Sequence, residues 1–102
     1  MATAIALYNT PKDPGAFDEY YVSTHVPLAK TLPGLRSYDV STGPVMMPAG
    51  PAPYHLVALL KFDTMEDLQA ALASAEGTAV VNDLANFASG GFSILLFDDK
   101  HA

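Results

Sequence analysis

The chain contains no cysteine, and its five lysines and arginines stand against eleven aspartates and glutamates. The absence of cysteine excludes disulfides, thiolate metal sites and a cysteine nucleophile. The net charge of -6 repels phosphate groups, so we expect no nucleic-acid partner. Only three histidines occur, at positions 25, 55 and 101, without the four-residue spacing of a helical metal site, and we therefore expect no metal.

Long hydrophobic runs and cofactor motifs are missing as well. No apolar run approaches the roughly 20 residues that span a bilayer, and residues 1–8 lack the basic region and the length of a signal peptide. We expect a cytoplasmic protein that does not enter a membrane. The motifs G-x-S-x-G, G-x-G-x-x-G and the P-loop are absent, so no cofactor is expected.

What the chain does have is apolar surface. Half of its 102 residues are hydrophobic and only 16% are charged, which predicts one folded domain over residues 1–102. This balance also suggests more apolar surface than a lone small domain can hide.

The apolar patterns predict a β-α-β-β-α-β order of elements. Strands are expected at residues 3–8, 35–42, 54–62 and 92–97. A first helix should begin at Asp13-Pro14 and end near Leu32, with a kink at Pro27. Two further helical pieces should lie on either side of Gly77, and residues 43–53, rich in proline, should form neither helix nor strand.

This order is typical of an α+β, ferredoxin-like sandwich, in which a four-stranded antiparallel sheet carries its helices on one side. If the other side faced water, each strand should alternate apolar and polar residues along its sequence. Residues 54–62 are instead apolar on both faces. Each exposed large aliphatic side chain forfeits roughly 1.5–3 kcal/mol of burial. We therefore expect a homodimer in which two sheets stack as a barrel, although chance hydrophobicity in so apolar a sequence is an alternative.

The run Phe17-Asp18-x-Tyr20-Tyr21-x-x-x-His25-x-Pro27-Leu28, with Pro51-Ala52-Pro53-Tyr54 later, resembles the EthD family. The resemblance implies a dimeric α/β barrel with a cleft between the sheet and the first helix. The family takes its name from the degradation of ethyl tert-butyl ether, and its members are commonly labelled reductases or oxidoreductases. Similar barrels include polyketide cyclases, lactone isomerases and cofactor-free monooxygenases.

Three residues of the first helix are the candidate catalytic groups. His25 follows Tyr21 by four residues, which places an imidazole and a phenol on adjacent turns as a possible proton-transfer pair. Tyr20 should lie on the opposite flank of the helix from His25. One tyrosine is expected in the core and the other in the pocket wall, and a purely structural role of His25 stays open.

Candidate substrate-binding residues lie on the same helix and around the proline-rich segment. Tyr54 and His55 should point to opposite faces of their strand, with His55 beside Val57 and Leu59. The segment at residues 43–53 either folds over the pocket or packs on a partner subunit. The expected set is Phe17, Met46, Met47, Tyr54 and His55.

Together these features predict a cofactor-independent enzyme of cyclase, isomerase, dehydratase or oxygenase type. It would act on a small apolar carbonyl, enol or phenol compound, with His25 as acid or base and a tyrosine as hydrogen-bond donor. An alternative is a non-catalytic accessory protein that binds a hydrophobic metabolite for an oxygenase system. A barrel filled by its own side chains, without a pocket, is a third hypothesis.

Overall fold

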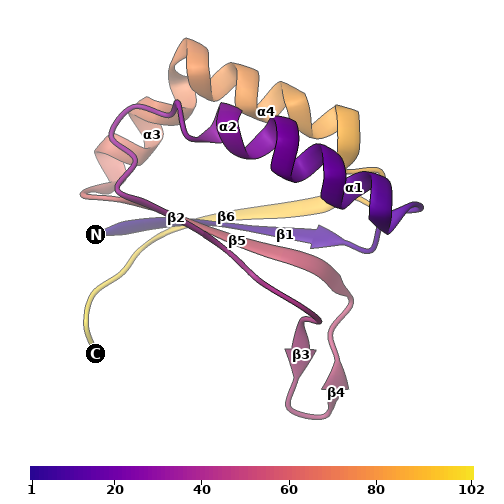
Figure 1. Cartoon of the computed structure of the whole chain (residues 1–102). Helices are drawn as coiled ribbons and strands as arrows, with labels where there is room; N and C mark the ends of the chain where they lie inside the picture. Colours follow the sequence, from indigo (N-terminus) through magenta and orange to yellow (C-terminus); the bar gives the residue numbers. More distant parts are fainter.

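A four-stranded antiparallel sheet carries all the helices on one side in the computed structural model, which describes all 102 residues (Figure 1). The strands are β1 (Ala2–Asn9), β2 (Ser37–Val40), β5 (Tyr54–Phe62) and β6 (Phe92–Asp98), in the order β2-β5-β1-β6. This is the ferredoxin-like arrangement that the sequence predicts. No helix is long and apolar enough to cross a membrane.

Side-chain oxygens cap the first turns of the helices that begin at Pro14 and Met65. Asp13 accepts a hydrogen bond from the Ala16 amide at 3.1 Å, and Thr64 accepts one from the Asp67 amide at 3.0 Å. Such caps satisfy backbone donors that a helix leaves unpaired. The helices are α1 (Pro14–Tyr20), η1 (Tyr21–His25), α2 (Val26–Ala29), α3 (Met65–Ala73) and α4 (Ala75–Phe87).

The predicted break at Gly77 is wrong, because the chain turns at Ser74 and Gly77 lies inside α4. The Ser74 side chain caps α4 by accepting a hydrogen bond from the Gly77 amide at 3.1 Å. A Cβ at position 77 would lie 2.2 Å from the Ala71 carbonyl oxygen. Glycine is therefore needed where α4 starts against the end of α3.

Pro27 lies within one continuous helical run, in which α1, η1 and α2 follow one another without a break (Figure 1). The predicted kink takes the form of a π-helical turn, in which the Val26 amide donates to the Tyr21 carbonyl. A proline ring clashes with the carbonyl four residues earlier, here that of Ser23. A wider turn separates the two groups, and such turns often mark functional sites.

The two faces of the sheet differ in how well they are covered. Ala2, Ala4, Ala6 and Tyr8 of β1 face the helices and are buried. The other side of β1 and β5 bears aliphatic side chains that are only half-buried, among them Ile5, Leu7, Val57 and Leu59. β6 is exposed along its whole length. The apolar open face that the sequence predicts is therefore present.

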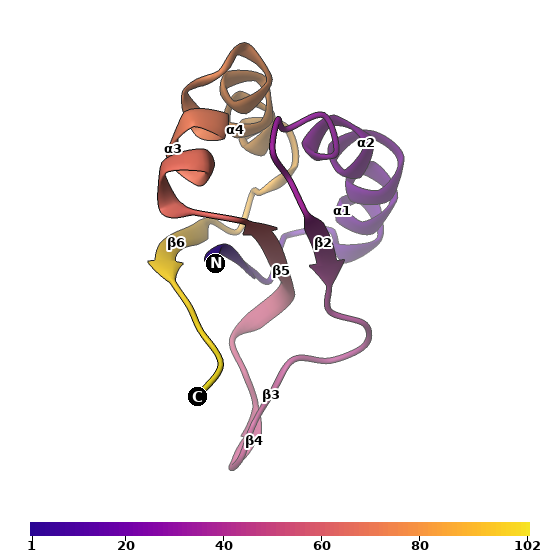
Figure 2. The ribbon, with the colours of Figure 1, turned by 90° about the vertical axis from the view of Figure 1, so that its left-hand side faces the viewer.

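Residues 43–53, called the arm below, project from the sheet on the side away from the helices (Figure 2). The arm contains two short paired strands, β3 (Met46–Met47) and β4 (Gly50–Pro51). The prediction that this segment forms no regular structure is therefore wrong. The chain turns at residues 48–49, so that two residues of each strand pair. Proline is tolerated here because Pro51 lies at the end of its strand.

Candidate active site

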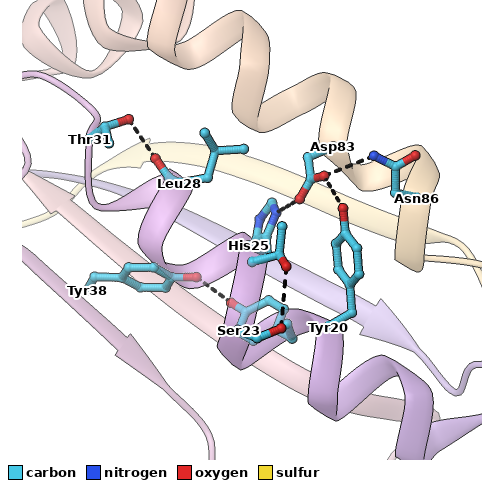
Figure 3. Close-up of polar contacts among 10 residues, drawn as sticks. Tyr20, Ser23, His25, Leu28, Thr31, Tyr38, Asp83 and Asn86 are labelled. Carbon is cyan, nitrogen blue, oxygen red and sulfur yellow. Dashed lines mark hydrogen bonds and ion pairs between the residues drawn. The ribbon is translucent and has the colours of Figure 1, made fainter.

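The buried side chain of His25 in η1 is held by Asp83 on α4. Its Nδ1 lies 2.9 Å from Asp83 Oδ2, and the two residues are only 3% and 7% exposed. The other carboxylate oxygen of Asp83 accepts hydrogen bonds from the Tyr20 hydroxyl at 2.6 Å and from the Asn86 amide at 3.0 Å (Figure 3). Asp83 thus joins the first helical run to α4.

These contacts set the charge of both groups. Burial opposes ionisation of Asp83, but the hydrogen bonds from Tyr20, Asn86 and His25 together hold its pKa below the usual 3.8. Burial lowers the pKa of His25 from 6.5, and Asp83 offsets this only in part. At neutral pH the pair is therefore a carboxylate and a neutral imidazole. Nδ1–H donates to Asp83, which leaves the lone pair on Nε2.

The Nε2 atom of His25 has no hydrogen-bond partner within the chain. Every fully buried side-chain nitrogen or oxygen does have a partner, so Nε2 is not fully buried. His25 also lines an almost wholly apolar cavity of about 50 Å³ between the sheet and the helices. We infer that Nε2 is accessible from this cavity. Other lining residues are Tyr21, Tyr38, Ala58, Leu60, Val81 and Ile94.

Two phenols of this cavity wall bind one another. The hydroxyl oxygens of Tyr21 and Tyr38 lie 2.6 Å apart. Only one of them donates in this contact, so the other keeps its proton for a third group. Burial raises the pKa of both phenols, which keeps them protonated as donors.

The π-helical turn brings Tyr20 and His25 to the same carboxylate, which corrects the prediction that they lie on opposite flanks. Five residues of ordinary α-helix would separate their directions by roughly 140°. A turn closed by i to i+5 hydrogen bonds instead returns such a pair to nearly the same side. Both side chains therefore bind Asp83.

Of the two adjacent tyrosines, Tyr21 is buried and also lines the His25 cavity, whereas Tyr20 is half-buried and does not line it. The predicted division into one core tyrosine and one pocket-wall tyrosine is therefore wrong. The Tyr21 and His25 rings lie 5.3 Å apart between centroids, as their spacing predicts. The Tyr21 hydroxyl, however, binds Tyr38 rather than His25. The rings of Tyr21 and His25 are thus in contact, as predicted. Their polar atoms do not bind each other, because the hydroxyl binds Tyr38 and Nδ1 binds Asp83.

A second histidine–aspartate pair lies apart from this cavity. His55 Nε2 is 2.7 Å from Asp18 Oδ1, and the His55 ring packs edge-on against Phe17 at 5.0 Å. β5 shifts its register here, because Tyr8 pairs with Leu56 and Asn9 with Tyr54. His55 is the extra residue of this bulge, so it contacts α1 instead of sharing a face with Val57 and Leu59 as predicted.

The remaining predicted binding residues do not reach His25 within one chain. Tyr54 and His55 line a surface groove of about 520 Å³ at the base of the arm. Met46 and Met47 are 60% and 49% exposed on the arm itself. Phe17 is buried between Tyr8 and Tyr21.

The family model of the EthD domain matches residues 9–91. The chain belongs to the EthD family. An uncharacterized 11.0 kDa protein from the thcB-thcC intergenic region of Rhodococcus erythropolis is 39% identical over 100 residues, covering 98% of this chain and 96% of that protein. A crystal structure of an EthD family protein from Bacillus halodurans is 36% identical, with a TM-score of 0.89 and coverage of 98% and 99%.

More distant structures share the fold of this EthD chain. SnoaB from Streptomyces nogalater, described as a cofactor-independent oxygenase, is 15% identical with a TM-score of 0.67 and coverage of 99% and 94%. A protein of unknown function from Thermobifida fusca, described as dimeric and ferredoxin-like, is 14% identical with a TM-score of 0.68 and coverage of 94% and 88%. At this identity the likeness concerns the fold alone.

The sequence prediction of the EthD site missed Asp83 and Tyr38. Asp83 left a local signal, because it falls among Val80, Leu84 and Phe87 on the apolar stripe of α4. A charged residue on a buried stripe needs a partner. Tyr38 left no comparable signal, since its strand alternates imperfectly.

Proposed function

We propose that the protein is a cofactor-independent enzyme in which His25 removes a proton from a small, largely apolar compound. The observation that carries the proposal is a buried imidazole that lines an apolar cavity, with Nδ1 on Asp83 and no partner at Nε2. A base that is neutral near pH 7 is suited to general base catalysis, and the carboxylate fixes its tautomer.

In the proposed step, the lone pair of His25 Nε2 takes a proton from a C–H beside a carbonyl, or from an enol or phenol O–H. From a C–H, the electron pair left behind moves to the substrate oxygen, whereas from an O–H it is already there. A hydroxyl of the Tyr21–Tyr38 pair then donates a hydrogen bond to that oxygen. Asp83 stabilises the resulting imidazolium. The proton then returns to the substrate or leaves to water.

This step is common to isomerisation, cyclisation, dehydration and cofactor-free oxygenation, so the substrate determines which reaction follows. The description of SnoaB as a cofactor-independent oxygenase supports chemistry without a bound cofactor on this fold. The oxidoreductase label of the family fits the proposal only in this oxygenase form.

We also propose that the working form is a homodimer. The cavity of about 50 Å³ is small beside the roughly 300–1,000 Å³ of ordinary ligand sites. Its wall includes Val81 and Ile94, which are 46% and 40% exposed, so a ligand can extend outward between them. The apolar open face and the dimeric description of a fold neighbour both support a second copy.

Hydrogen–deuterium exchange tests the proton transfer without knowledge of the product. The protein would be incubated in D₂O with a panel of small 1,3-diketones and cyclic ketones, and the loss of the α-proton signal followed by NMR. We expect at least one compound to exchange faster than in buffer. His25→Gln should reduce that acceleration by roughly 100-fold or more, since general base catalysis contributes about that much.

His101→Gln is the matched control, because it removes an exposed histidine from the chain end. Its exchange rate should equal that of the unaltered protein. Equal rates for the His25 variant would contradict the proposed role. Binding of a panel compound without any acceleration would instead support the alternative, a non-catalytic accessory protein that holds a hydrophobic metabolite.

A further inference from the structure

The edge strand β6 is the least covered part of the fold. Its large side chains are 39% to 53% exposed and lie on both faces of the strand: Phe92, Ile94, Leu95, Leu96 and Phe97. Phe92, Ile94 and Leu96 are paired with Tyr8, Ala6 and Ala4, which are buried beneath the helices. This row therefore points to the helix side, but the helices do not extend over it.

The same row reaches the candidate active site. Ile94 lines the His25 cavity together with Val81 of α4, and both side chains are exposed. The cavity is therefore bounded on this side by side chains whose outer surfaces nothing in the chain covers. A cover over the β6 row would also close the cavity.

The arm is the only other place where adjacent large apolar side chains are exposed to this extent. Met46 and Met47 are 60% and 49% exposed, and β3 pairs only with β4. The arm projects from the sheet face opposite the helices (Figure 1). It therefore extends toward the side on which the proposed second copy would pack.

The length of the arm indicates how far it reaches. Stacked sheets lie about 10 Å apart, whereas each leg of an eleven-residue hairpin spans roughly 15 Å. An arm that starts at one sheet is therefore long enough to pass an edge of the other sheet and reach the level of its helices. The β2 edge carries the polar residues Ser37 and Asp39 and one exposed large apolar residue, Val40, while the β6 edge exposes five.

The area is also that of an interface. Per chain, the two methionines of the arm and the five exposed side chains on both faces of β6 leave on the order of 600 Å² of apolar surface. The methionines and the helix-side row of three account for more than half of it, and the other face of β6 would be covered by the stacked sheet, so the total approaches the ~800 Å² per partner of a standard interface. Methionine side chains adapt well to such a surface.

We propose that the partner's Met46 and the partner's Met47 pack on Phe92, Ile94 and Leu96 and form the outer wall of the His25 cavity. This inference rests on the homodimer proposed above, and it makes each site a product of two chains. It also gives the two methionines a place beside the ligand that one chain alone does not offer.

The absence of cysteine makes a direct test possible, since any introduced thiol is unique. Met47→Cys and Ile94→Cys chains of different tag length would be co-expressed and oxidised mildly. We expect a disulfide-linked species that contains one chain of each kind, because disulfides form only between residues whose Cα atoms lie within about 7 Å. Non-reducing electrophoresis and mass spectrometry would identify it.

Val22→Cys replaces Ile94→Cys in the matched control, because Val22 is 70% exposed on η1, away from β6. Equal cross-linking to both positions, or linking of Met47→Cys only to itself, would overturn the proposed arrangement. Light scattering on the unaltered protein separates the two proposals. A monomer would refute the homodimer and this inference together, whereas a dimer without the specific link would refute this inference alone.

Discussion

The two histidine–aspartate pairs of this chain have nearly the same length, 2.9 Å for His25–Asp83 and 2.7 Å for His55–Asp18. Their surroundings differ far more than their geometry. The Asp83 side chain is 8% exposed and has three hydrogen-bond donors, while the Asp18 side chain is 59% exposed and has one. Burial and the number of partners, rather than distance, decide what such a pair contributes.

The largest expected difference between the pairs is in stability. Asp83→Ala leaves His25, Tyr20 and Asn86 without their acceptor, and we expect a loss of about 3 kcal/mol or more in the free energy of unfolding. Asp18→Ala should cost less than about 1 kcal/mol. Urea denaturation at one fixed protein concentration measures both. Equal losses would remove the distinction between the pairs.

The pH dependence of stability should also follow the buried pair. Since the pKa of His25 is lowered from 6.5 in the folded state, the unfolded chain binds a proton that the folded chain does not. Stability then falls as the pH drops below 6.5, by at most about 1.4 kcal/mol per pH unit for one proton. His25→Gln should flatten this dependence in the range just below pH 6.5.

Asp83 should affect the pH dependence of stability in a separate, more acidic pH range. Its pKa is held below 3.8, so its contribution is present above that pH and is lost as the pH falls through the lowered pKa. Urea denaturation in a series of buffers resolves the two ranges. An unchanged slope just below pH 6.5 in the His25 variant would show that this histidine does not cause it.

The smallest expected difference concerns a single hydroxyl. The hydrogen bond to Asp83 raises the pKa of Tyr20, and Tyr20→Phe removes that bond from a half-buried site. We expect a loss in the free energy of unfolding that is clearly smaller than the loss in Asp83→Ala. Tyr54→Phe, whose hydroxyl has no partner in the chain, should change it by less than about 0.5 kcal/mol. A similar loss in both variants would show that the Asp83 cluster gains nothing from Tyr20.

Most of the fold was predictable because its signals are local. Residues 54–62 form a strand with the predicted bounds, since β-branched and aliphatic residues fill both faces and turn residues flank them. The N-terminus of α1 at Pro14 follows from Asp13 as its cap. Patterns of this kind need only a few neighbouring residues to be interpreted.

The site was predictable only in part, because it depends on contacts between distant segments. His25 and Asp83 are 58 positions apart, so the partner of the histidine is fixed by helix packing. The directions of Tyr20 and His55 were wrong for another reason. Each lies at a departure from regular geometry, the π-helical turn and the β-bulge, where a constant angle per residue no longer holds.

The place of β1 in the sheet has a consequence for the time at which the protein folds. β1 is a central strand, yet one of its two neighbours is β6, and 96 positions separate the paired residues Ala2 and Asp98. At a synthesis rate of roughly 5–20 residues per second, β6 is made on the order of 5 to 20 seconds after the apolar β1. A sheet completed by so distant a pairing is expected to form slowly. The nascent chain therefore depends on β5 and the first helix to shield β1 until the last strand leaves the ribosome.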